Sequence, residues 1–327
     1  MTCKSHRWLI GGASVIALGC FLTTPALSAD LMDPMKPGPE RTVSGTFDLY
    51  GGWSSHDFQN RTADSFDSDY PLLGGAARVD LPFSENLSIQ LDLEGEAAFT
   101  DGTDNNGPSE SDNYGGGAVS AAHLNYRQVD EFLIGLFGGA GVAAVNDTGS
   151  TGKDPALYFI GVEGQMYFGD ITLYGQVGYM DAESDATQEE LTNAFFLRGV
   201  GRYYFNGGHT KLEGEFSYAN GKQDEGITGA ASDDMEIFGW GGQLTHQFYN
   251  WGNDGYLAGF VRYEGRYYDE DETTGPTGND HEEHTILVGL SVGLNQYSLK
   301  TTERTGVALD LPDFTRWVAG TTAVDAE

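Results

Sequence analysis

The chain has 327 residues, of which 49 are acidic and 17 are basic, so its formal net charge is −32. A charge of this size and sign disfavours binding to nucleic acid or to an anionic surface through bulk charge, and nucleic acid is not an expected partner. Hydrophobic residues make up only 39% of the chain, and 47 residues are glycine. This composition suits many short strands and turns better than helices packed around a large core.

Residues 1–29 have the three parts of a secretory signal peptide. Lys4 and Arg7 give a basic start, and an apolar stretch follows them. The small residues at the end of this stretch suit signal peptidase, with cleavage after Ser28 or Ala29. We therefore expect the mature chain to start near residue 30 and to be exported.

A lipoprotein signal is the alternative for this leader, because small and apolar residues precede Cys20. If signal peptidase cleaves after Ser28 or Ala29, both cysteines, Cys3 and Cys20, are removed with the leader. The mature chain then has no disulfide and no cysteine-based metal site. No later run of about 18 apolar residues exists, so the pattern predicts no transmembrane helix.

The mature sequence begins with a proline-rich stretch and continues as a series of strands. Residues 30–41 hold three prolines and cannot pair in a sheet, so they are expected to be a periplasmic lead-in. Residues 42–294 contain twelve amphipathic stretches, separated alternately by tight turns and long acidic loops. The predicted strands are 42–54, 70–83, 86–99, 114–127, 131–145, 156–168, 171–180, 191–205, 210–219, 235–248, 256–268 and 284–294.

The stretch 86–99 shows the alternation most clearly. Leu87, Ile89 and Leu91 fall on one parity, while Asp92 and Glu94 fall on the other. Successive side chains of a strand point to opposite faces, so one face is apolar and the other carries carboxylates. Repeated twelve times at membrane-spanning length, this pattern predicts an all-β fold, an up-and-down transmembrane β-barrel with lipid outside and a polar lumen.

The two ends of the predicted barrel differ in charge. The long loops contain 26 of the 49 acidic residues and are expected to be extracellular. They are either simply solvated, or they bind divalent cations that bridge to lipopolysaccharide, or they concentrate cations at a pore mouth. The short turns lie near aromatic residues that suit an interfacial girdle: Phe83, Phe132, Phe168, Phe205, Phe248, Tyr249 and Trp251.

Charged residues within the strands fall on the lumen parity, as expected because a cation on the lipid side costs roughly 2–4 kcal/mol at mid-depth. These groups either line a water-filled constriction and set its ion selectivity, or pair off and close the lumen. The predicted lumen charges are Asp48, Arg78, Asp80, Asp92, Glu94, Glu96, Arg127, Glu163, Arg198, Arg202, Lys211, Glu213, Glu215, Arg262, Glu264 and Arg266.

The last strand carries a short motif. Residues 289–294 read as glycine followed by alternating hydrophobic residues, which looks like the signal recognised by the barrel-assembly machinery. With the architecture of residues 42–294, the chain resembles the porin-like outer-membrane β-barrels of Gram-negative bacteria. The resemblance implies a place in the outer membrane, contact with lipid and lipopolysaccharide, and passage of small hydrophilic solutes.

The chain departs from that family after Leu294. Family members usually end at this point with an aromatic residue, whereas this chain continues through residues 295–327. We expect this tail to be either a periplasmic extension or a plug that folds into the lumen.

No residue pattern predicts an enzyme or a cofactor. The histidines 56, 123, 209 and 246 are isolated from any spacing that suggests a nucleophile and its base. The stretch 280–284 is the only metal-like cluster, and it is interpreted as a polar loop or a weak metal site. The leading hypothesis is therefore a porin-like barrel that passes solutes passively. A non-conducting structural or surface-interaction barrel and a soluble β-sandwich are the alternatives.

Overall fold

The computed structural model describes residues 41–58, 68–99, 113–146, 154–183, 190–224, 233–271 and 280–322. The predicted signal peptide, nearly all of the lead-in and most of the long acidic loops lie outside these residues. The strands are β1 (Ser44–Phe58), β2 (Ser68–Pro82), β3 (Leu87–Ala98), β4 (Asn113–Gln128), β5 (Phe132–Asn146), β6 (Ala156–Phe168), β7 (Ile171–Glu183), β8 (Glu190–Phe205), β9 (Thr210–Asp224), β10 (Asp233–Asn250), β11 (Gly255–Asp271) and β12 (His281–Leu294).

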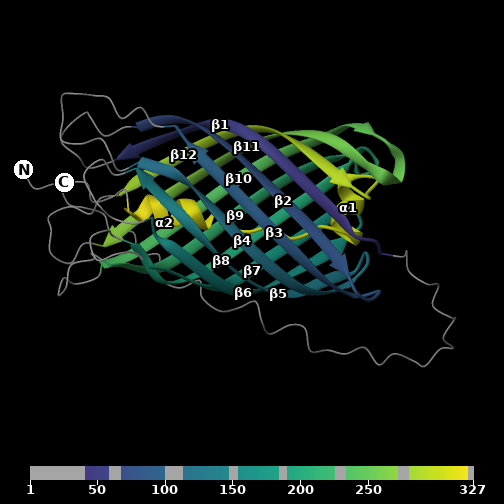
Figure 1. Ribbon diagram of the computed structural model, residues 1–327, viewed down its shortest axis with the longest axis horizontal. Helices are drawn as coiled ribbons and strands as arrows, with labels where there is room; N and C mark the ends of the chain where they lie inside the picture. Colours follow the sequence, from purple (N-terminus) through teal and green to yellow (C-terminus); the bar gives the residue numbers. More distant parts are fainter. Residues whose placement is uncertain are drawn as a thin grey trace, which may run out of the picture. The chain divides into compact units, whose positions relative to one another are not determined.

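These twelve strands form one closed barrel (Figure 1). Each strand pairs antiparallel with its sequence neighbours, and β1 pairs with β12 from Gly45 opposite Leu294 to Phe58 opposite His281. No sheet edge is left open, so every strand finds a partner for its backbone groups on both sides. The predicted up-and-down barrel is confirmed.

The faces of the barrel are the reverse of those of a soluble protein. Leu93 and Ile160 point outward and are 59% and 66% exposed, whereas Gln90 and Asp80 point inward and are fully buried. An exposed apolar belt around a buried polar interior is the arrangement expected of a wall between lipid and an enclosed lumen. The soluble β-sandwich alternative is therefore wrong, because the apolar rows do not meet a second sheet.

Aromatic residues mark both borders of this belt. At the short-turn end, Phe83, Phe168 and Tyr249 are all more than half exposed. At the long-loop end, outward-facing tyrosines donate hydrogen bonds to polar neighbours, such as Tyr158 to Asp181 at 2.8 Å. Tyrosine suits a lipid–water interface because its ring is apolar and its hydroxyl is polar.

The strands extend further at the long-loop end than the sequence predicts. Strand β7 continues to Glu183 instead of residue 180, β9 to Asp224 instead of 219, and β12 begins at His281 instead of 284. Beyond the membrane border the outer face need not be apolar, so alternation is lost while backbone pairing continues. Periodicity alone cannot detect such extensions.

Two short helices follow β12. These are α1 (Leu299–Thr305) and α2 (Phe314–Thr322), and the 3-10 turns Asn206–Gly208 and Gly252–Asp254 connect strands at the short-turn end. No helix among the described residues is long and apolar enough to cross a membrane.

Candidate functional site

The chain beyond Leu294, which we call the lumen segment (residues 295–322), lies inside the barrel. Ser298 caps α1 by accepting a hydrogen bond from Thr301 N at 3.2 Å. At the short-turn end, Lys300 Nζ lies 2.8 Å from Asp170 in the β6–β7 turn. At the other end, Gln223 near the end of β9 donates to Thr321 O at 3.3 Å. The segment therefore runs from one end of the barrel to the other, with α1 and α2 at opposite ends (Figure 1).

Inward-facing amides bind the backbone of the extended part, residues 306–313. Gln90 donates to Leu309 O at 2.8 Å and accepts hydrogen bonds from Ala308 N and Leu309 N. Gln165 donates to Ala308 O, and Gln176 donates to Asp310 O at 2.9 Å. A buried strand-like segment with no partner strand would leave its peptide groups unpaired, and these side chains satisfy them.

The carboxylate of Asp310 contacts two arginines of β8. Its carboxylate oxygens accept one hydrogen bond each, from Arg198 Nη1 and Arg202 Nη2, both at 2.6 Å. The same arginines pair with carboxylates of the neighbouring β9, Arg198 with Glu215 and Arg202 with Glu213, both at 2.5 Å. Asp310 thus joins a charge network that the barrel wall already contains.

A second ionic cluster surrounds the start of α2. Arg316 lies 2.7 Å from Glu96 on β3 and 2.5 Å from Glu283 on β12. Arg266 of β11 pairs with Glu283 at 3.1 Å and also with Asp313 of the lumen segment. The lumen segment therefore supplies charges of both signs, which link β3 to the non-adjacent strands β11 and β12.

Apolar packing holds α2. The ring centroids of Phe314 and Phe159 are 4.2 Å apart, and Phe314 also meets Phe196 edge-on at 5.1 Å. Trp317 is only 1% exposed and packs against the same group. These four aromatic residues and Phe137 form a hydrophobic core inside the barrel, at positions where a water-filled lumen would carry polar side chains.

A buried histidine joins two of the wall carboxylates. His123 lies 2.8 Å from Glu163 and 3.4 Å from Asp92, and its side chain is fully buried. Tyr174 donates to the second oxygen of Glu163 at 2.8 Å. Partners on several strands thus surround these carboxylates. Together with His123 and Tyr174 they form a buried polar core, in contrast to a channel lining that faces water.

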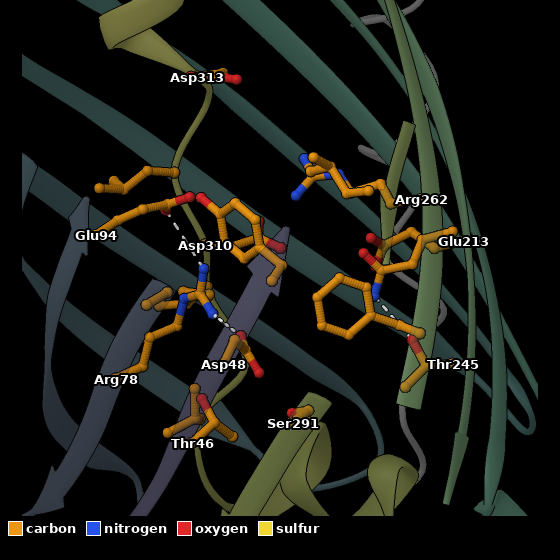
Figure 2. A pocket seen from close by; sticks show the side chains of 18 of the residues that line it. Thr46, Asp48, Arg78, Glu94, Glu213, Thr245, Arg262, Ser291, Asp310 and Asp313 are labelled. Atoms are coloured by element: carbon orange, nitrogen blue, oxygen red, sulfur yellow. Dashed lines mark hydrogen bonds and ion pairs between the residues drawn. The ribbon is translucent and has the colours of Figure 1, made fainter. Parts of the chain in front are cut away.

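A chamber of about 160 Å³ remains beside the extended part of the lumen segment. Figure 2 shows Arg78, Asp48 and Glu94 on one side of it, and Arg262 and Glu213 on the other. Arg78 lies 2.7 Å from Asp48 and 3.5 Å from Glu94. One ordered water needs roughly 10–15 Å³ by this kind of measure, so the chamber holds on the order of ten waters.

Outer-membrane channel proteins are among the solved structures to which the chain is similar. An outer membrane channel of Pseudomonas putida F1 has 12% sequence identity, and the match covers 81% of this chain and 99% of that one with a TM-score of 0.48. The KdgM porin has 12% identity, coverage of 77% and 98%, and a TM-score of 0.36. OccK1 of Pseudomonas aeruginosa has 8% identity, coverage of 77% and 98%, and a TM-score of 0.35.

These likenesses concern the fold alone. No protein-family model and no curated protein matches the sequence. A closed barrel with an apolar outer belt is the architecture of outer-membrane proteins. The fold is that of a transmembrane β-barrel.

The sixteen predicted lumen charges all lie on inward faces, but they fall into four groups. Asp92 and Glu163 flank His123, whereas Asp80 and Arg127 are buried at the short-turn end. Glu215 and Arg266 line a smaller cavity beside α2. The remaining ten line the chamber: Asp48, Arg78, Glu94, Glu96, Arg198, Arg202, Lys211, Glu213, Arg262 and Glu264.

The stretch 280–284 is not the polar loop that the sequence indicates. Residues 281–284 belong to β12, where His281 is buried inside and His284 faces outward against Tyr263. The outermost pairs of β1 and β12 continue the sheet there, which explains the error. Among the described residues no group of three or more histidines, cysteines or carboxylates is arranged to hold a metal ion.

Sequence reasoning missed the partners on the lumen segment. Asp310 belongs to the first ionic cluster and Asp313 and Arg316 belong to the second, and none of them was among the predicted sites. A usable signal was present in the strands. Phe159 shares its parity with Glu163, and Phe196 shares its parity with Arg198, so aromatic rings point into the predicted lumen. Such rings indicate an interior that another part of the chain fills.

Proposed function

We propose that this protein is an outer-membrane channel through which ions and small hydrophilic solutes diffuse passively past the lumen segment. The chamber is the observation that carries this proposal. It is a charged space inside a twelve-stranded barrel, bordered by the wall on one side and by residues 307–313 on the other. In this proposal the lumen segment acts as a plug, and the chamber beside it is the route that remains for solutes.

The chamber carries more negative than positive charge. Eight carboxylates and five basic groups line it, including Glu94 and Asp313 on the acidic side and Lys211 and Arg262 on the basic side. An excess of carboxylates in a narrow, low-dielectric space raises the local concentration of cations. We therefore propose a preference for cations, which the acidic loops at the extracellular end reinforce.

A non-conducting structural or surface-interaction barrel is the second candidate. The aromatic core around Phe314 and Trp317 favours it, since packed rings exclude water at the long-loop end. In that case the acidic loops would bind cations or partners, lipopolysaccharide among them, and the lumen segment would be a stabilising core. We propose no enzymatic role for either candidate.

Planar-bilayer recording with the full chain separates the two candidates. For a channel we expect small, cation-selective conductance steps, and larger steps in a variant with a loosened segment, Trp317→Ala. If neither protein gives steps while heat-modifiable migration on a gel shows an intact barrel, the channel proposal fails. Divalent-cation-dependent stabilisation without conductance would then support the structural candidate.

A further inference from the structure

The short-turn end of the lumen contains an arginine whose charge is not compensated. Arg127, near the end of β4, is fully buried, and its Nε, Nη1 and Nη2 atoms all lack a hydrogen-bond partner among the described residues. The guanidinium group stays protonated at any pH that a protein experiences. Burying it without a partner is therefore costly, because the group cannot lose its charge by deprotonation.

Two more arginines with unused donors lie in the same region. Arg41 donates to Asp80 at 2.7 Å and to Ser88, but its Nη1 has no partner. Arg304 of α1 donates to backbone carbonyls of the β6–β7 region and lies 3.9 Å above the ring of Tyr167, but its Nε has no partner.

Contacts connect these groups into one cluster. Ser88 Oγ joins Arg41 to Asn125, and Asn125 lies two residues before Arg127 on the same face of β4. The amide nitrogen of Asn125 also lacks a partner. Arg41 Nε donates to Thr305 O, the residue that follows Arg304. The unused donors therefore belong to three parts of the chain: the approach to β1, the wall strand β4 and the helix α1.

The carboxylates nearby do not balance this cluster. Asp80 and Glu303 are the two carboxylates whose charges act on Arg127. Asp80 pairs with Arg41 through Oδ2, while its Oδ1 makes no hydrogen bond among the described residues. Glu303 pairs with Arg202 at 2.7 Å and accepts from Thr172. Asp80 offsets one of the three arginine charges, and Glu303 is already shared with the wall, so a net positive charge remains buried.

We propose that Arg127, Arg41 and Arg304 form a binding site for a small inorganic anion. Water could satisfy the unused donors, but it would leave the charge in place, whereas an anion satisfies the donors and the charge together. The bound anion joins the start of β1, the wall and α1, and so fastens the lumen segment at the short-turn end. This inference does not depend on whether the barrel conducts.

The test is the anion dependence of unfolding, measured on the full chain in detergent by heat-modifiable migration. Ionic strength is held constant while gluconate, a large organic anion, is replaced by chloride, bromide, nitrate or phosphate. We expect a saturable rise of the unfolding temperature in the wild-type protein, and an apparent affinity at least tenfold weaker in Arg127→Met. In gluconate alone, Arg127→Met should unfold no earlier than the wild type, since it removes an unpaired buried charge.

A matched control keeps the result specific. Arg316→Gln also removes a buried lumen arginine, but one that is fully paired with carboxylates, so its anion dependence should equal that of the wild type. If Arg127→Met does not fold, Arg304→Met takes its place. The proposal is overturned if the wild type shows no anion-specific rise, if both arginine variants keep it, or if crystals grown in bromide show no anomalous peak beside Arg127.

Discussion

The two halves of the lumen segment are held by different forces. The extended half is held by hydrogen bonds and ion pairs, from Gln90 to its backbone and from Arg198 and Arg202 to Asp310. The helical half, α2, is held by the packing of Phe314 and Trp317 in addition to the ion pairs of Arg316. Polar contacts exchange for contacts with water at little net cost, whereas exposed apolar surface does not. The polar half thus determines where the segment lies, and the apolar half determines how firmly it stays.

The largest effect is expected from Trp317→Ala. Removing a buried tryptophan costs about 3–5 kcal/mol, which is enough to release α2 from the wall. We expect a several-fold rise in bilayer conductance. Trp251→Ala, which removes a partly exposed interfacial ring, should leave the conductance unchanged. If Trp317→Ala conducts like the wild type, the lumen segment does not limit passage.

A smaller effect is expected from Asp310→Asn. This change weakens two charged hydrogen bonds, worth about 1.5–3 kcal/mol, but Arg198 keeps Glu215 and Arg202 keeps Glu213. Conductance should rise less than in Trp317→Ala, and the difference from the wild type should shrink at high salt. Glu85→Gln, in the exposed β2–β3 turn, is the control. A larger rise in conductance than in Trp317→Ala would mean that the extended half, and not α2, holds the segment more firmly.

The chamber offers a test of selectivity without release of the segment. Glu94→Gln removes one negative charge from its lining, so the preference for cations should fall by up to about threefold while the conductance stays similar. The reversal potential in a potassium chloride gradient measures this. Glu236→Gln, on the outward face of β10, should not move it. An unchanged reversal potential in Glu94→Gln would show that ions do not pass through the chamber.

The smallest effect is expected at the exposed contact between α1 and the β6–β7 turn. The hydrogen bond and the charge of Lys300 lower the pKa of Asp170. A carboxylate whose pKa is lowered in the folded state stabilises that state at pH values above the ordinary aspartate pKa of about 3.9. This contribution is lost as the pH falls through the lowered pKa. Asp170→Asn should therefore unfold slightly earlier at pH 7, and the difference should disappear under acid conditions. Glu131→Gln, in the β4–β5 turn, is the control.

Most of the barrel could be predicted from the sequence because lipid imposes a strict rule. A charge facing hydrocarbon is costly, so Arg198 and Glu213 could be assigned to the interior from parity alone. The number of strands followed from the repeated alternation between the tight turns and long loops. The ends of β7 and β9 were missed because strand residues above the membrane follow no such rule.

The interior could not be predicted to the same depth. Parity predicts that Arg127 and Arg202 point inward. It does not predict that, among the described residues, Arg202 has three carboxylate partners and Arg127 has none. Those differences depend on where the lumen segment crosses the interior, and no periodic pattern marks that path. The placement of α2 depends on close fit, since a Cβ at Gly117 would lie 2.6 Å from the side chain of Thr315.

The position of the lumen segment directly after β12 has a consequence for biogenesis. Because the segment follows β12 directly, it is attached to the strand whose pairing with β1 closes the barrel. Enclosing it while the seam between β1 and β12 is still open requires no passage of Trp317 through a finished wall. Closing the seam and burying the tail are thus two aspects of one maturation step, and a defect in the tail would delay the folded form.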